Sequence, residues 1–206
     1  MRALDCDYLV CSGYKAFAPH MGFAWCRREA INRLPTFRED FIPDVTPDKL
    51  EAGTYAYESV SGMDAAVRYL EDLGRRFGER PSRTEVLHTA MNRIADYERA
   101  LSKSLLDEVL RIPGVTVYGV TDRERLNERV PTLCFTVAGY ESSAIAAALA
   151  ARDIGVRSGH MYSPRLMARI CPLPAGAVRA SLVHYNTASE IARFGVALRE
   201  VLDELG

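Results

Sequence analysis

The sequence has almost no excess of charge of either sign, and this excludes one class of partners. Its 26 Lys and Arg residues against 27 Asp and Glu residues leave a formal net charge of −1 at pH 7. Proteins that bind nucleic acids normally carry a basic excess or a basic stripe, because they have to neutralise the phosphate backbone. No nucleic-acid partner is therefore expected.

Long apolar runs and a signal peptide are also missing. No stretch approaches the roughly 20 apolar residues that a helix needs to cross a bilayer. Asp5 and Asp7 occupy the place where the apolar part of a signal peptide would lie. We therefore expect no membrane association and a cytoplasmic location.

The cysteines and histidines lack the spacings of metal sites and of disulfide frameworks. The five cysteines are odd in number and include no Cys-x-x-Cys pair, and the four histidines show no His-x-x-x-His spacing. We expect neither a metal centre nor structural disulfides.

What the sequence does contain is an alternation of strand and helix patterns. Apolar runs at 7–12 and 22–26 predict two short buried strands with a loop between them. Capping boxes at Ser82–Glu85 and Thr187–Glu190 predict the starts of two helices. Between these helices, residues 115–183 alternate between strand and helix patterns.

These patterns predict an α/β fold in two parts. Residues 1–80 offer too few elements to close a core and are expected to pack against something else. Residues 81–206 would form a long helix and a compact α/β unit. Apolar spacings of three and four predict that the buried face of the long helix consists of Leu87, Met91, Ile94, Tyr97, Leu101, Leu105 and Val109.

A lysine follows the first predicted strand, in the sequence CSGYK at 11–15. A lone lysine at such a place usually covers apolar surface with its stem and reaches water with its ammonium. Here Ser12 and Tyr14 offer hydroxyls that suit a phosphate, and an aromatic surrounding would bury Lys15. Because burial of a lysine favours the neutral amine that Schiff-base chemistry needs, this pattern indicates pyridoxal phosphate, whose aldehyde condenses with a lysine.

Four segments, in the same order, resemble those of the class V aminotransferase family, which includes cysteine desulfurases and selenocysteine lyases. The segments are DYLVCSGYKAFAPHMGFAWCRRE, LEAGTYAYESVSGMDAAVRYLEDLG, VRSGHMYSPRLM and VRASLVHYNTASEIARF. The resemblance covers essentially the whole chain. It implies the C-terminal half of a fold type I pyridoxal phosphate enzyme: a remnant of the large cofactor-binding domain, a long connecting helix and a small α/β domain.

The resemblance also implies roles around the cofactor. Lys15 would hold pyridoxal phosphate covalently and shuttle the substrate α-proton. Ser12 and Tyr14 would bond the cofactor phosphate, with Tyr14 standing where the family often has histidine. Gly53 and Thr54 would reach the phosphate of the neighbouring subunit's cofactor, which implies a homodimer.

On the substrate side, the resemblance implies an amino-acid-type substrate. Arg179 would clamp its carboxylate, a bidentate task that suits arginine. Arg157 would lie near the same pocket, although a lone arginine is more often a solvated charge. His160 and Tyr162 belong to the substrate-side loop, where the desulfurases have a catalytic cysteine. Tyr162 stands at the position of that cysteine and cannot accept sulfur, so the usual desulfurase reaction is not expected.

Two hypotheses remain open, because family members carry further cofactor contacts in an N-terminal half that residues 1–14 cannot supply. One contact is an aspartate that pairs with the pyridine nitrogen. The chain is then part of a lyase, an aminotransferase, or an epimerase or racemase that obtains its other half elsewhere. Alternatively, it is a truncated product or a non-catalytic folding or interaction module. The other half would come from a partner chain or lie outside this sequence.

Overall fold

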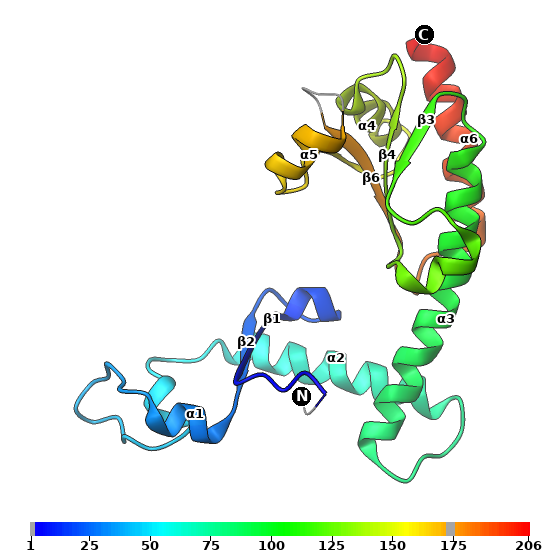
Figure 1. The fold of residues 1–206 in the computed structure, drawn as a ribbon. Helices are drawn as coiled ribbons and strands as arrows, with labels where there is room; N and C mark the ends of the chain where they lie inside the picture. Colours follow the sequence, from blue (N-terminus) through cyan, green and yellow to red (C-terminus); the bar gives the residue numbers. More distant parts are fainter. Residues whose placement is uncertain (1–2, 172–175) are drawn as a thin grey trace. The chain divides into compact units, whose positions relative to one another are not determined.

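The computed structural model describes residues 3–171 and 176–206 (Figure 1). Contacts group the chain into two compact units, Met1–Ala90 and Met91–Gly206. The helix α3, Arg83–Leu110, begins in the first unit and continues in the second.

The first unit begins with an antiparallel hairpin of β1, Tyr8–Ser12, and β2, Gly22–Cys26. Ser12 is paired with Gly22, so residues 13–21 form the loop at one end of the hairpin. A backbone hydrogen bond of 2.7 Å from the amide of Gly13 to the carbonyl of Met21 closes this loop. Its first residues form a short 3-10 helix, η1, Gly13–Ala16.

Both strands of this hairpin are largely exposed, so the prediction of buried strands is wrong for this chain. Val10 is 77% exposed, and the rings of Tyr8 and Trp25 are also accessible to solvent. The reason is that two strands alone cannot cover both faces of the sheet that they form.

The other regular elements of the first unit are helices. After the hairpin come α1 (Arg28–Arg33), the 3-10 helix η2 (Asp48–Leu50), α2 (Tyr57–Arg75) and the beginning of α3. Helix α2 approaches the loop of the hairpin closely at Gly62, where an added Cβ would lie 2.3 Å from Cγ of Pro19. A glycine at this position therefore allows α2 to support the loop.

The second unit contains a four-stranded antiparallel sheet with the order β3-β4-β6-β5. The strands are β3 (Val115–Tyr118), β4 (Thr132–Val137), β5 (Arg157–Gly159) and β6 (Ala177–Ser181). A 3-10 segment, η3, Arg123–Glu128, precedes β4. The prediction of an α/β fold is confirmed.

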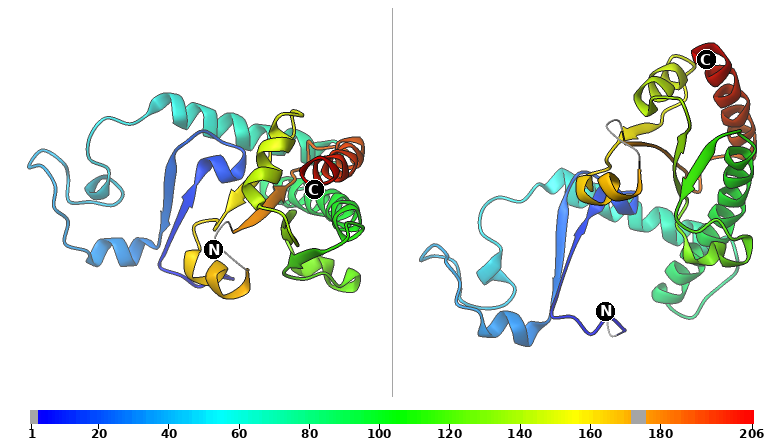
Figure 2. Two further views of the ribbon diagram at one scale, coloured as in Figure 1. Left: turned by 90° about the horizontal axis from the view of Figure 1, so that it is seen from above. Right: turned by 45° about the horizontal axis from the view of Figure 1, so that its top comes forward.

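Helices cover the two faces of this sheet unequally (Figures 1 and 2). Three helices pack with the sheet around the main core. They are the long α3, α4 (Ser142–Ala150) and α6 (Ala188–Leu205). The short α5, Pro164–Ile170, belongs to a smaller cluster on the opposite face. The largest fully buried side chains of the main core are Phe135, Leu106, Ile145, Leu149, Leu198, Val109, Val178 and Val201. No described helix combines the length and the apolar character of a membrane span.

The long helix buries one stripe of residues along its length. Ile94, Leu101, Leu105 and Val109 are buried as predicted, whereas Met91 is 46% exposed. At the start of the helix the buried residues are Val86 and Ala90. The predicted stripe is therefore confirmed at Ile94 and from Leu101 onward, whereas Met91 and Tyr97 within it are exposed.

Candidate functional site

The turn that contains Lys15 directly follows β1. Ser12 ends the strand, and Tyr14 and Lys15 lie in η1. The sequence predicted burial of this lysine, but Lys15 is exposed and Tyr14 is 49% exposed. The burial that would favour a neutral amine is therefore not supplied by this chain in the structure.

An aromatic pair lies beside the amine of Lys15. The rings of Tyr14 and His20 stack with centroids 4.7 Å apart and planes inclined by 19°. Nζ of Lys15 lies 5.7 Å from the centroid of the Tyr14 ring, within the range of a cation–π contact. The two ends of the loop thus meet through side chains as well as through the backbone.

Gly53 and Thr54 lie in another segment of the first unit, before α2. Both are exposed, and Gly53 has a φ of +84°, which glycine adopts without strain. No hydrogen bond among the described residues joins Thr54 to the turn of Lys15. A shared phosphate site of these segments stays a prediction.

In the second unit, register pairs place four side chains in one row across the sheet. Tyr118 is opposite Cys134, Cys134 is opposite Arg179, and Arg179 is opposite Arg157. Directly opposite residues of antiparallel strands point to the same face of the sheet. The structure therefore brings the two predicted arginines together on the face away from the main core.

Arg179 is half-buried, and its Nε atom is buried without a hydrogen-bond partner among the described residues. A buried guanidinium N–H without an acceptor is costly, and a carboxylate is the acceptor that fits its planar donors. Arg157 on the neighbouring strand is exposed and adds a second positive charge. Together the two side chains form a candidate anion site.

The sequence reasoning missed Cys134 as a neighbour of Arg179. Burial raises the pKa of the Cys134 thiol, and nearby Cys171 raises it further, while the positive charge of Arg179 acts in the opposite direction. The thiol is thus held in its protonated form at neutral pH. Only the strand alternation in 132–137 could have placed Cys134 away from the core, because the pairing register does not appear in a local pattern.

The loop that contains His160 and Tyr162 has an unusual backbone. Met161 and Tyr162 have φ values of 50° and 62°, in the left-handed region that residues with a Cβ rarely adopt. Tyr162 is 86% exposed, and His160 is also exposed. Strained residues of this kind often occur at binding sites, which supports a functional role for the loop.

A close backbone contact fixes the start of this loop against β6. An added Cβ at Gly176 would lie 2.3 Å from the carbonyl carbon of Gly159, so no larger residue fits there without movement. Cys171, at the end of α5, is only 4% exposed and directs Sγ to the carbonyl of Gly176 at 3.3 Å. The loop at 160–162 thus projects from a tightly packed base.

A family model, aminotransferase class-V, matches residues 1–194. The chain therefore belongs to the class V aminotransferase family, and the resemblance seen in the sequence is confirmed. It is 35% identical over 205 residues to an aminotransferase-like protein, FGM3, of Gibberella zeae, covering 98% of this chain and 48% of that protein. It is 31% identical to a probable cysteine desulfurase of Synechocystis, covering 98% of this chain and 46% of that protein.

Solved structures show the same relationship. The structure of a cysteine desulfurase from Thermococcus onnurineus matches with a TM-score of 0.76 and 26% identity, over 98% of this chain and 48% of that one. The chain thus spans about half the length of the curated relatives and of the solved structure that it matches. The activity of a whole protein of this family is consequently a matter for proposal.

Proposed function

We propose that this chain is the C-terminal part of a pyridoxal phosphate-dependent enzyme that acts on an amino-acid-type substrate. The observation that supports it most strongly is the pair of arginines on β5 and β6. Arg179 offers a buried, unpartnered Nε, and Arg157 lies directly opposite it. This pair suits the carboxylate that all α-amino acids share.

The donors near Lys15 fit two parts of the cofactor. The amine of Lys15 suits an aldehyde, and the hydroxyls of Ser12 and Tyr14 suit a phosphate. The acids that precede Lys15 do not fit the third part, the pyridine nitrogen. Asp5 and Asp7 pair with Arg27 at the opposite end of the hairpin. A partner chain or a preceding segment would have to supply that carboxylate.

Each residue then has a definite task in the assembled enzyme. When bound, pyridoxal phosphate supplies an electron sink for the bond that breaks at the α-carbon of the substrate. Lys15 would hold the aldehyde and move the α-proton, and Arg179 would orient the substrate through its carboxylate. Gly53 and Thr54 would contact the phosphate of a second subunit's cofactor in a homodimer. His160 and Tyr162 would border the substrate.

Within this family we propose a reaction other than cysteine desulfuration. Tyr162 stands where the desulfurases have their sulfur-accepting cysteine, and a phenol cannot form a persulfide. Cys171 is buried, and the raised pKa of Cys134 leaves little thiolate. Neither thiol is therefore a good replacement, and a lyase, an aminotransferase or an epimerase reaction fits better.

A second candidate function is a folding or interaction module that is not catalytic by itself. The exposed apolar side chains of the hairpin, Val10 above all, favour it. In this case the chain would bind a partner through the first unit and would have no need of the cofactor. The two candidates differ in whether Lys15 reacts as a cofactor lysine.

The lysine content of the chain allows a sharp test of the first candidate. The sequence has only three lysines, Lys15, Lys49 and Lys103. Lys49 is buried and paired with Asp44 at 3.0 Å, whereas Lys103 is exposed like Lys15. The full chain would be incubated with pyridoxal phosphate, reduced with borohydride and digested, and the modified peptides identified by mass spectrometry.

The proposal predicts modification of the peptide that contains Lys15. The variant Lys15→Arg should lose this adduct, and Lys103→Arg should keep it. An adduct that is spread equally over Lys15 and Lys103, or that survives in Lys15→Arg, would refute the assignment and leave the interaction module as the better account.

A further inference from the structure

A small cavity lies in the second unit, on the side of the sheet away from Arg179. Its volume is about 170 Å³, and Leu105, Ala180, Ile191 and Phe194 provide a buried apolar lining. Ala180 and Arg179 are neighbours in β6, so their side chains point to opposite faces of the sheet. This cavity is therefore separate from the proposed substrate site.

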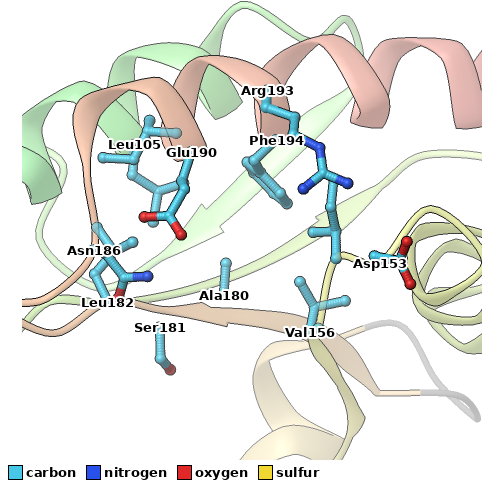
Figure 3. A pocket seen from close by; sticks show the side chains of 13 residues that line it. Leu105, Asp153, Val156, Ala180, Ser181, Leu182, Asn186, Glu190, Arg193 and Phe194 are labelled. Atoms are coloured by element: carbon cyan, nitrogen blue, oxygen red, sulfur yellow. The ribbon is translucent and has the colours of Figure 1, made fainter.

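Two charged side chains of α6 border this cavity. Figure 3 shows Glu190 and Arg193 extending from α6 toward β6, on either side of Phe194. Residues three apart on a helix are neighbours and often pair with each other. No ion pair joins these two within the described residues, although the positive charge of Arg193 contributes to lowering the pKa of Glu190.

The backbone orients both charged groups. One carboxylate oxygen of Glu190 accepts hydrogen bonds from the amide and the hydroxyl of Thr187, at 2.6 and 3.0 Å. One Nη of Arg193 donates to the carbonyl of Arg152 at 2.6 Å. The side chain of Asn186 also hydrogen-bonds the carboxylate of Glu190. A carboxylate accepts about four hydrogen bonds and a guanidinium has five N–H donors, so both groups can still serve a ligand.

We propose that this cavity binds a free α-amino acid with an apolar side chain. The carboxylate would bind Arg193, the ammonium would bind Glu190, and the side chain would pack against Phe194 and Ala180. The size agrees, because a protein cavity of about 150 Å³ holds a benzene molecule. A zwitterion satisfies both rim charges at once, whereas a purely apolar ligand leaves them unused.

Asp153 lines the same end of the cavity as Arg193 and opposes the ligand carboxylate. No ion pair joins Asp153 to Arg193 in the described part of the chain. Its φ of 57° is one that asparagine adopts readily, so Asp153→Asn removes the charge with little change of the backbone. This variant and Arg193→Gln should change the affinity in opposite directions.

The experiment is a titration of the full ¹⁵N-labelled chain with L-leucine, followed through backbone amide shifts. Two matched ligands each lack one charge: 3-methylbutylamine has no carboxylate, and 4-methylpentanoate has no ammonium. Arg199→Gln is the control variant, because Arg199 is on α6 but pairs with Glu108 outside the cavity. Circular dichroism of each variant would verify that it is folded.

We expect saturable shifts at Ala180, Asn186 and Phe194, with a dissociation constant of about 1 mM for leucine. Arg193→Gln should weaken the binding of leucine about tenfold, because one charged hydrogen bond to its carboxylate is lost. The same variant should leave the binding of 3-methylbutylamine unchanged. Asp153→Asn should strengthen the binding of leucine about threefold, because it removes a negative charge near the leucine carboxylate. Arg199→Gln should have no effect.

Three results would overturn the proposal. One is an absence of saturable shifts at the cavity. Another is equal binding of all three ligands with no response to Arg193→Gln, which would leave only an apolar crevice. The third is leucine shifts confined to Arg157 and Arg179, which would support the proposed substrate site while refuting a second amino-acid site.

Discussion

At the scale of a residue, Arg179 carries a buried polar group that the proposed substrate site would explain. Its Nε is buried without an acceptor, whereas Arg157 on the next strand keeps its side chain in water. Leaving a polar group buried and unbonded costs about 1–3 kcal/mol, which a bound carboxylate would recover. A protein that keeps a residue for such a site is expected to be less stable than a variant with an apolar residue at the same position.

We therefore predict that Arg179→Met raises the free energy of unfolding by about 1 kcal/mol. Arg157→Met, at the exposed partner position, should change it by less than about 0.5 kcal/mol. Chemical denaturation of the three chains would measure both values. A destabilisation by Arg179→Met would show that the guanidinium stabilises the fold of the free chain, which contradicts an unsatisfied group that needs a bound anion.

Single residues were predictable from the sequence where type and position suffice. Lys15 after an apolar run and Arg179 within one both lie where the pattern placed them. The exposure of Lys15 was not predictable, because burial depends on which other elements cover the turn. Cys134 was missed as a neighbour of Arg179 because cross-strand register is a long-range property.

At the scale of elements, the capping box of α6 shows what local chemistry determines. The hydroxyl of Thr187 accepts from the amide of Glu190, and the carboxylate of Glu190 accepts from the amide of Thr187. Both bonds join residues three apart, so the sequence alone predicted them. The short α5 went unpredicted.

This cap predicts a pH dependence of stability. The hydrogen bond from the amide of Thr187, followed by that from its hydroxyl, lowers the pKa of Glu190. Because the pKa is lower in the folded state, the stabilisation is fully present above the usual pKa of glutamate and is lost as the pH falls through the folded-state pKa.

The variant Glu190→Gln should therefore melt below the wild type at pH 7, and the difference should shrink as the pH is lowered past about 4. Glu200→Gln, an exposed change on the same helix, is the control. A difference between wild type and Glu190→Gln that stays constant or grows at acidic pH would contradict this reading of the cap.

The whole chain combines one unit with a closed core and one without. The largest fully buried side chains belong to the second unit, whereas the hairpin of the first exposes Val10 and Tyr8. The sequence predicted this imbalance, because the elements before the long helix are too few to form a core. The chain spans about half the length of the relatives that it matches.

Amide hydrogen exchange should reveal this imbalance. Amides of β4 and β6, in the centre of the four-stranded sheet, should exchange much more slowly than those of β1 and β2. The hairpin amides are expected to open more easily because both strands of the hairpin are largely exposed. Equal protection of the two sheets in the isolated chain would mean that the first unit is stable by itself, against the need for a partner.

The central claim, that the turn of Lys15 is a site for pyridoxal phosphate, is tested most directly by the dependence of labelling on the phosphate. The chain would be labelled with pyridoxal phosphate or with pyridoxal, reduced, and the ratio of adducts at Lys15 and Lys103 measured. If Ser12 and Tyr14 bind the phosphate, charged hydrogen bonds should raise this ratio at least about tenfold for pyridoxal phosphate. The same ratio with both reagents would contradict the account.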